Sequence, residues 1–138
     1  MLFRSIQFER YPEMLTKRKK MIEKMDAAFA DINVTVLNHY GKNHASSGHL
    51  YIVRLLGKTR EQTNKIIEMM AERGIATNVH YKPLPMMTAY KKMGFDIKDF
   101  PNAYHMFENE ITLPLNTKMT MEDVDYVIAD FVDIVKSF

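Results

Sequence analysis

The feature that most constrains the fold is the apolar stripe of the C-terminal segment. After Thr120, apolar side chains recur every three or four residues, which is the spacing of one face of an α-helix. Acidic side chains lie opposite, and Thr120 followed by Asp123 has the form of a helix N-cap. The predicted stripe consists of Val124, Val127, Ile128, Phe131, Val135 and Phe138. Such a helix is stable only when its apolar face packs on another element.

A second long helix is expected near the N-terminus. Pro12 suits the first turn of a helix, and from there to about Asp31 the apolar residues again repeat every three or four positions. The basic run TKRKK, which starts at Thr16, lies between these apolar positions. It is therefore predicted to form a solvated helix face and not a nucleic-acid-binding patch.

Short β-rich runs between these helices predict a small sheet. Residues 34–37 and the run LYIVRLL, which starts at Leu50, form two expected strands joined by the polar loop NHYGKNHASSGH. IATNVHY, which follows Gly74, predicts a third strand that Pro83 and Pro85 bring to an end. ITLPL predicts the last strand.

Three shorter helices complete the pattern. Thr59 and Gln62 have the spacing of a capping box, and a glycine ends that helix. Further short helices are expected at about Met87–Met93 and Pro101–Asn109. Together these elements predict an α+β fold: a small antiparallel or mixed sheet of three to four strands, packed against helices on one face, with a long N-terminal and a long C-terminal helix.

Composition indicates a single domain, residues 1–138, of an intracellular type. The 19 basic and 17 acidic residues leave a formal charge of +2, which gives no strong attraction to nucleic acid or to a membrane surface. The absence of cysteine suits the reducing cytoplasm. The apolar runs are too short to cross a bilayer, and Arg4, Glu9 and Arg10 interrupt the first of them. Neither a membrane anchor nor a signal peptide is expected.

Common catalytic and cofactor-binding motifs are absent from the sequence. It contains no GxGxxG, GxxxxGK[ST], HExxH or GxSxG pattern. His39, His44 and His49 follow one another at five-residue steps, which suits neither one strand face nor one helix face, so a zinc site is not predicted. Ser46 and Ser47 beside His49 are better explained by loop composition than by a nucleophile and its base.

Five motifs nevertheless occur in a fixed order, with Tyr90 and Gly94 between the third and the fourth. They are QFERYPEMLTKRKKMIEKMDAAF, HLYIVRL, RGIATNVHYKPLP, FPNAYHMFENEITLPL and MTMEDVDYVIADFV. In order and spacing they resemble the C-terminal small domain of the DegT/DnrJ/EryC1/StrS aminotransferases, which are pyridoxal-phosphate-dependent enzymes of fold type I. The resemblance covers nearly the whole chain.

The resemblance implies transamination of a keto group on a nucleotide-linked sugar, with an amino acid as donor and pyridoxal phosphate as electron sink. Such enzymes make sugars for cell-surface polysaccharides or secondary metabolites. In the family the Schiff-base lysine and the phosphate cup belong to a large α/β domain upstream, and no lysine of this chain matches that site. The chain is therefore expected to be a fragment that alone binds no pyridoxal phosphate and is inactive. It is also expected to form a homodimer or to self-associate.

The segment GIATNVHYKPLP borders the active-site cleft in this family, so the resemblance makes His80, Tyr81 and Lys82 candidates for substrate binding. His80 and Tyr81 would hydrogen-bond sugar hydroxyls or a diphosphate, and Lys82 would pair with phosphate. The alternative is structural: a satisfied histidine at a strand end, a packed tyrosine ring and a solvated lysine. The sequence departs from the family where Pro85 replaces a frequent second histidine, and at Arg4, where a small residue is usual.

Two other classes of function stay open at this stage, and a nucleic-acid binder is the weaker of them. A domain of this size could be a stand-alone ligand-sensing or protein-interaction module without catalysis, because a fold does not fix a function. The sugar, the ring carbon and the amino donor are not specified by the sequence.

Overall fold

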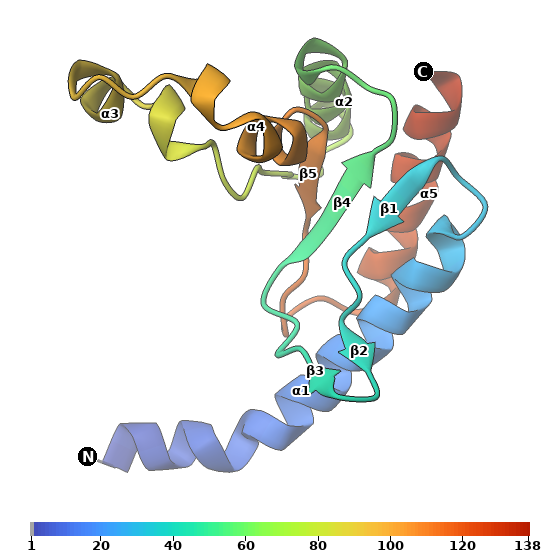
Figure 1. The fold of residues 1–138 in the computed structure, drawn as a ribbon. Helices are drawn as coiled ribbons and strands as arrows, with labels where there is room; N and C mark the ends of the chain where they lie inside the picture. The colour runs from blue at the N-terminus through green and yellow to red at the C-terminus, as the bar shows by residue number, and fades with distance from the viewer. Residues whose placement is uncertain (1) are drawn as a thin grey trace.

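The computed structural model in Figure 1 describes residues 2–138 and, among them, the side chains from Ile6 onward. The helices are α1 (Leu2–Phe29), α2 (Arg60–Glu72), α3 (Thr88–Lys92), α4 (Pro101–Phe107) and α5 (Met121–Ser137). The strands are β1 (Val34–Val36), β2 (Tyr40–Gly41), β3 (His44–Ala45), β4 (Tyr51–Leu55) and β5 (Glu110–Leu113). The Arg4 side chain, where the sequence departs from the family pattern, lies outside the described residues.

The main sheet is antiparallel and has the strand order β1–β4–β5. Its register places Val34 opposite Leu55, and Tyr51 opposite Leu113. The polar loop between β1 and β4 forms a small hairpin of its own, in which β2 pairs with β3. The predicted α+β fold, with a small sheet and long helices at both ends, is confirmed.

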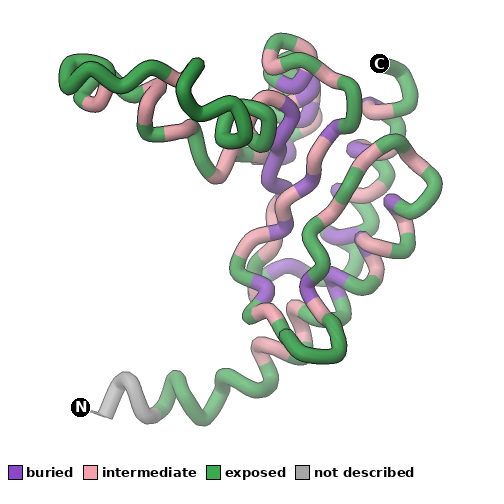
Figure 2. Tube along the Cα trace, in the orientation of Figure 1, coloured by how far each residue is buried: buried purple, intermediate pink, exposed green. Residues whose placement is uncertain are grey.

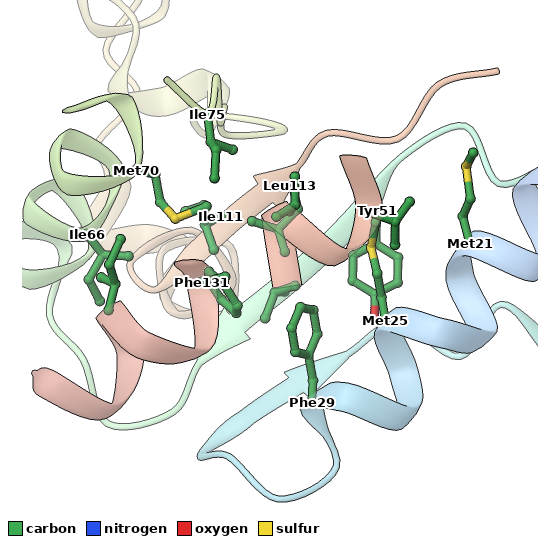
Figure 3. Close-up of a cluster of buried hydrophobic side chains, with 14 of the residues drawn as sticks. Met21, Met25, Phe29, Tyr51, Ile66, Met70, Ile75, Ile111, Leu113 and Phe131 are labelled. Atoms are coloured by element: carbon green, nitrogen blue, oxygen red, sulfur yellow. The ribbon is translucent and has the colours of Figure 1, made fainter. Parts of the chain in front are cut away.

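The hydrophobic core lies between one face of the sheet and helices α1, α2 and α5 (Figure 1, Figure 3). Along β4, Tyr51, Val53 and Leu55 are buried and alternate with half-buried residues, as expected for a strand with one face in the core. The Tyr51 hydroxyl donates a hydrogen bond of 2.7 Å to Asp26 Oδ1 on α1, which ties that helix to the central strand. The aromatic ring of Phe131 on α5 packs 5.0 Å from the ring of Phe29 on α1.

Helix α1 starts earlier than the sequence predicts. It begins at Leu2 and continues through Pro12, so the prediction that Pro12 occupies the first turn is wrong. Proline within a helix removes one hydrogen bond and crowds the carbonyl of the preceding turn, but its fixed φ remains helical. Figure 1 shows that α1 is bent along its length, and proline is a common cause of such bends. Residues 6–11 of α1 are exposed, and this part of the helix projects from the body of the domain (Figure 2).

Helices α2 and α5 begin at the predicted caps. The Thr59 side chain accepts from the Gln62 N–H and the Gln62 side chain accepts from the Thr59 N–H; Thr120 and Asp123 form the same reciprocal pair. Of the predicted α5 stripe, Val124, Val127 and Phe131 are buried, and Ile128 and Val135 are half-buried against the core. Near the end of the helix Ile134 is buried, whereas Phe138 is 41% exposed. Among residues 2–138, no helix has both the length and the hydropathy needed to cross a membrane.

The predicted strand IATNVHY is reduced to a single bridge. Asn78 pairs with Thr112 of β5 through two backbone hydrogen bonds of 3.1 and 2.7 Å. The next two backbone N–H groups bond to side chains instead: that of Val79 to Asn78 Oδ1 and that of His80 to Glu110 Oε2. The prediction of a strand is wrong because side-chain acceptors replace the carbonyls that would continue the ladder.

The second face of the sheet is also covered in part, which corrects the expectation of helices on one face only. Ile52 and Arg54 alternate with the buried Val53 and therefore point away from the core. They line a cavity together with residues of α4, which lies on this side of the sheet (Figure 1). The predicted short helices are confirmed as α3 and α4, and single 3-10 turns at Leu84–Met86 and Ile97–Asp99 precede them.

Candidate functional site

A cavity of about 300 Å³ lies between the outer face of the sheet and α4. Its walls come from β1, β4, the start of β5, α4 and the segment that leaves the sheet after Asn78. The lining residues are mostly apolar, and the polar exceptions include Arg54, His80, Tyr81 and Glu110. An apolar hollow with a few convergent polar groups is typical of a small-molecule site.

His80 is held in this cavity by two residues of β5. Its backbone N–H donates to Glu110 Oε2 at 3.0 Å, and its ring nitrogen Nδ1 lies 2.9 Å from Thr112 Oγ1. The Thr112 hydroxyl in turn donates to Glu110 Oε1 at 2.7 Å. Glu110 and Thr112 are 5% and 6% exposed, so this network is shielded from water on the side of the sheet.

The backbone explains why these residues meet. The two backbone hydrogen bonds between Asn78 and Thr112 fix the register of the segment after Ile75 relative to β5. Side chains alternate along a strand, so Glu110 and Thr112 point to the same face of the sheet. His80 lies two residues beyond Asn78, and its ring bonds to Thr112, so it lies on that face as well.

Two arginines support the end of α4 beside the cavity. Arg54 donates from Nη2 to the His105 carbonyl at 3.0 Å and from Nε to Asn109 Oδ1 at 3.0 Å. Arg60 donates to the Phe107 carbonyl at 2.9 Å, and its guanidinium lies 4.9 Å from the centre of the Phe107 ring. Burial lowers the pKa of Arg60, while the nearby Glu110 carboxylate acts in the opposite direction. The end of α4 is thus held by cationic groups that suit its exposed carbonyls.

The structure places the three predicted site residues differently. His80 is half-buried in the cavity wall, and Tyr81 is 71% exposed, with its ring edge-on to that of His80 at 4.7 Å. Lys82 is exposed and does not line the cavity. Pro85, which replaces the family's frequent second histidine, lines a separate apolar hollow with Leu84, Tyr90 and other residues.

Sequence reasoning missed Arg54, Glu110 and Thr112. The signal for Glu110 was present, because an acid at the start of a short apolar strand needs a partner when it is buried. Arg54 likewise interrupts an otherwise apolar strand. Neither signal identifies His80 as the partner, because that pairing depends on the bridge between Asn78 and Thr112.

The cavity does not fit pyridoxal phosphate as a Schiff-base site. That cofactor needs a lysine whose amine forms the internal linkage, and no lysine lines the cavity among the residues that the structure describes. The remaining histidines do not supply a metal site in the described part of the chain either, because no group of three His, Asp or Glu side chains is suitably placed there. His39 is buried, with its ring stacked on Tyr51 at 5.7 Å, and burial lowers its pKa.

The similarity to known proteins is consistent over nearly the whole chain. A spore coat polysaccharide biosynthesis protein, SpsC, of Bacillus subtilis is 33% identical over 94% of this chain and 34% of its own length. The pyridoxal-phosphate form of a putative sugar aminotransferase from Streptococcus pneumoniae is 48% identical, with a TM-score of 0.93 over 96% of this chain and 34% of its own. Helicobacter pylori PseC, an aminotransferase involved in the biosynthesis of pseudoaminic acid, is 27% identical with a TM-score of 0.83.

The chain thus spans about a third of the length of the relatives that it matches. Residues 3–132 match the model of the DegT/DnrJ/EryC1/StrS aminotransferase family. Because this match extends over nearly the whole chain, the chain belongs to the DegT/DnrJ/EryC1/StrS aminotransferase family.

Proposed function

We propose that the chain forms the C-terminal small domain of a pyridoxal-phosphate-dependent aminotransferase that acts on a nucleotide-linked keto sugar, with an amino acid as donor. The observation that carries this proposal is the family match over residues 3–132. Relatives named as UDP-sugar and dTDP-sugar aminotransferases, each matched over about a third of its length, support the substrate class and the role as one part of a larger catalytic unit.

The contribution of this domain is a wall of the substrate site, not the reacting groups. The cavity presents a histidine ring, a tyrosine and a guanidinium around an apolar floor, which suits a sugar ring with its hydroxyls. His80 and Tyr81 are the proposed substrate contacts. Lys82, which is exposed and does not line the cavity, would meet only the charged phosphates of a larger ligand.

Pyridoxal phosphate belongs to the complete enzyme in this proposal. When bound, it supplies the electron sink for transamination, and its lysine would come from outside this chain. A cytoplasmic location is part of the proposal and is supported by the absence of cysteine. Self-association is also part of it, supported by the exposed apolar residues Ile6, Phe8 and Tyr11 on the projecting arm of α1.

A titration tests the substrate role of the cavity. Isotope-labelled chain is mixed with UDP-N-acetylglucosamine, and the backbone NMR resonances of Arg54, His80 and Glu110 are expected to shift together and saturate. His80→Ala is expected to weaken this binding about tenfold to a hundredfold, the equivalent of losing one hydrogen bond of about 1 to 3 kcal/mol. His49→Ala, at an exposed loop residue that does not line the cavity, serves as the matched control.

The result that would contradict the proposal is equally specific. If His80→Ala lowers the melting temperature but leaves the affinity per folded molecule unchanged, His80 is a structural residue. If the nucleotide sugar shifts only resonances remote from the cavity, this face of the sheet is not the substrate site.

A further inference from the structure

The hydrogen-bond network behind His80 has a defined direction. An ionised carboxylate offers only acceptors, and both oxygens of Glu110 are engaged: Oε2 accepts the backbone N–H of His80, and Oε1 accepts the hydroxyl of Thr112. A threonine hydroxyl has a single hydrogen, which is donated here to Glu110. Thr112 Oγ1 can therefore act only as an acceptor toward the His80 ring.

This direction fixes the hydrogen on the imidazole. Since Thr112 Oγ1 accepts, the His80 Nδ1 at 2.9 Å must carry the hydrogen. In the neutral ring the other nitrogen, Nε2, then has a lone pair and no hydrogen. Nε2 has no hydrogen-bond partner among the described residues, and His80 lines the cavity.

We propose that Glu110 and Thr112 are positioning residues that hold His80 as its Nδ1–H tautomer, so that Nε2 accepts a hydrogen bond from the ligand in the cavity. This inference rests on the proposed function and makes it more specific. An acceptor nitrogen suits a hydroxyl or N–H of the sugar. It does not suit a diphosphate, which has no hydrogen to donate when ionised.

The residues around this network stabilise the direction of its hydrogen bonds. Glu110 and Thr112 are both buried, so water has little access to replace either bond. The pair of backbone bonds between Asn78 and Thr112 holds the donor and acceptor at fixed separation. Arg60 donates from Nη1 to the Glu110 carbonyl at 3.4 Å, so a cationic group lies beside this residue.

Glu110→Gln is the sharpest test, because it keeps the shape of the side chain, removes the negative charge and replaces one acceptor by a donor. The His80 backbone N–H still requires an acceptor, so the amide oxygen of the glutamine is expected to face it. The amide NH2 then faces Thr112 and donates to Oγ1. The Thr112 hydroxyl is released to donate to His80 Nδ1, and the imidazole hydrogen moves to Nε2.

Ring-nitrogen NMR shifts report this tautomer directly, measured at about pH 8.5, where an ordinary histidine is neutral. The expected result is Nδ1–H in the wild type and Nε2–H in Glu110→Gln. Thr112→Ser, which keeps the hydroxyl, is expected to retain Nδ1–H, whereas Thr112→Val is expected to lose the preference. The amide resonances of the helix α5 cap show whether each variant is folded.

Three outcomes would overturn the inference. The first is an Nε2–H ring in the wild type. The second is an Nδ1–H ring that persists in folded Glu110→Gln. If that variant does not fold, an Nδ1–H ring that persists in folded Thr112→Val overturns the inference instead. The third is a switch to Nε2–H when UDP-N-acetylglucosamine binds. Failure of this nucleotide sugar to bind would count against the proposed function, while the tautomer in the free chain still tests the network.

Discussion

The hydrogen bond between Tyr51 and Asp26 provides a quantitative test of the core. Tyr51 is completely buried in the middle of β4, and its hydroxyl donates to Asp26 Oδ1 at 2.7 Å. Burial and this bond both raise the pKa of Tyr51, so the phenol stays neutral and remains a donor at ordinary pH. Tyr51→Phe removes this donor and keeps the ring that packs against Phe29 and His39.

The expected loss follows from the nature of the bond. A hydrogen bond to a charged acceptor contributes about 1.5 to 3 kcal/mol. Asp26 is only half-buried and can recover water in the variant, so the loss should lie near the lower end, about 1 to 2 kcal/mol. For a domain of this size, that is a fall in melting temperature of roughly 3 to 10 °C.

Chemical and thermal denaturation of the wild type, Tyr51→Phe, Asp26→Ala and the double variant measure this directly. The two single losses should not add, because each removes the same bond. Tyr126→Phe is the matched control: its hydroxyl donates to the Arg73 carbonyl at 2.8 Å, but the residue is 54% exposed, so its loss should be smaller. A change below about 0.5 kcal/mol in Tyr51→Phe, or additive single losses, would refute the reasoning.

Three further predictions concern acid stability, the cofactor and assembly. Burial lowers the pKa of His39, so below about pH 6.5 the unfolded chain binds more protons than the folded chain, and the free energy of unfolding should fall on acidification. His39→Phe should weaken this dependence of the unfolding free energy on pH, and an unchanged dependence would contradict the role of His39. Mixed with pyridoxal phosphate and reduced with borohydride, the chain should show no stoichiometric labelling of a single lysine, which mass spectrometry would detect if it occurred. Sedimentation at increasing concentration should show self-association that Phe8→Lys weakens, whereas a monomer at every concentration would contradict the role of the exposed arm.

Local signals in the sequence were sufficient for the elements that depend on neighbours along the chain. The reciprocal caps at Thr59 and Thr120 involve residues three positions apart, and helical spacing identified the face of α5. The fold class could be predicted from these elements, because the apolar faces of two long helices and a small sheet can be buried in only a few arrangements. The resemblance to the family also rested on sequence alone, and it led to His80 and Tyr81.

Tertiary structure decided the features that depend on contacts between distant residues. Helix α1 runs through Pro12 because the cost of one lost hydrogen bond does not by itself end a helix. The strand expected around Asn78 shrinks to one bridge, because the side chains of Asn78 and Glu110 take the hydrogen bonds that a ladder would use. His80 acquires its setting only when β5 is brought alongside. No local pattern links it to residues 110 and 112, yet these residues bond its backbone N–H and its ring nitrogen Nδ1.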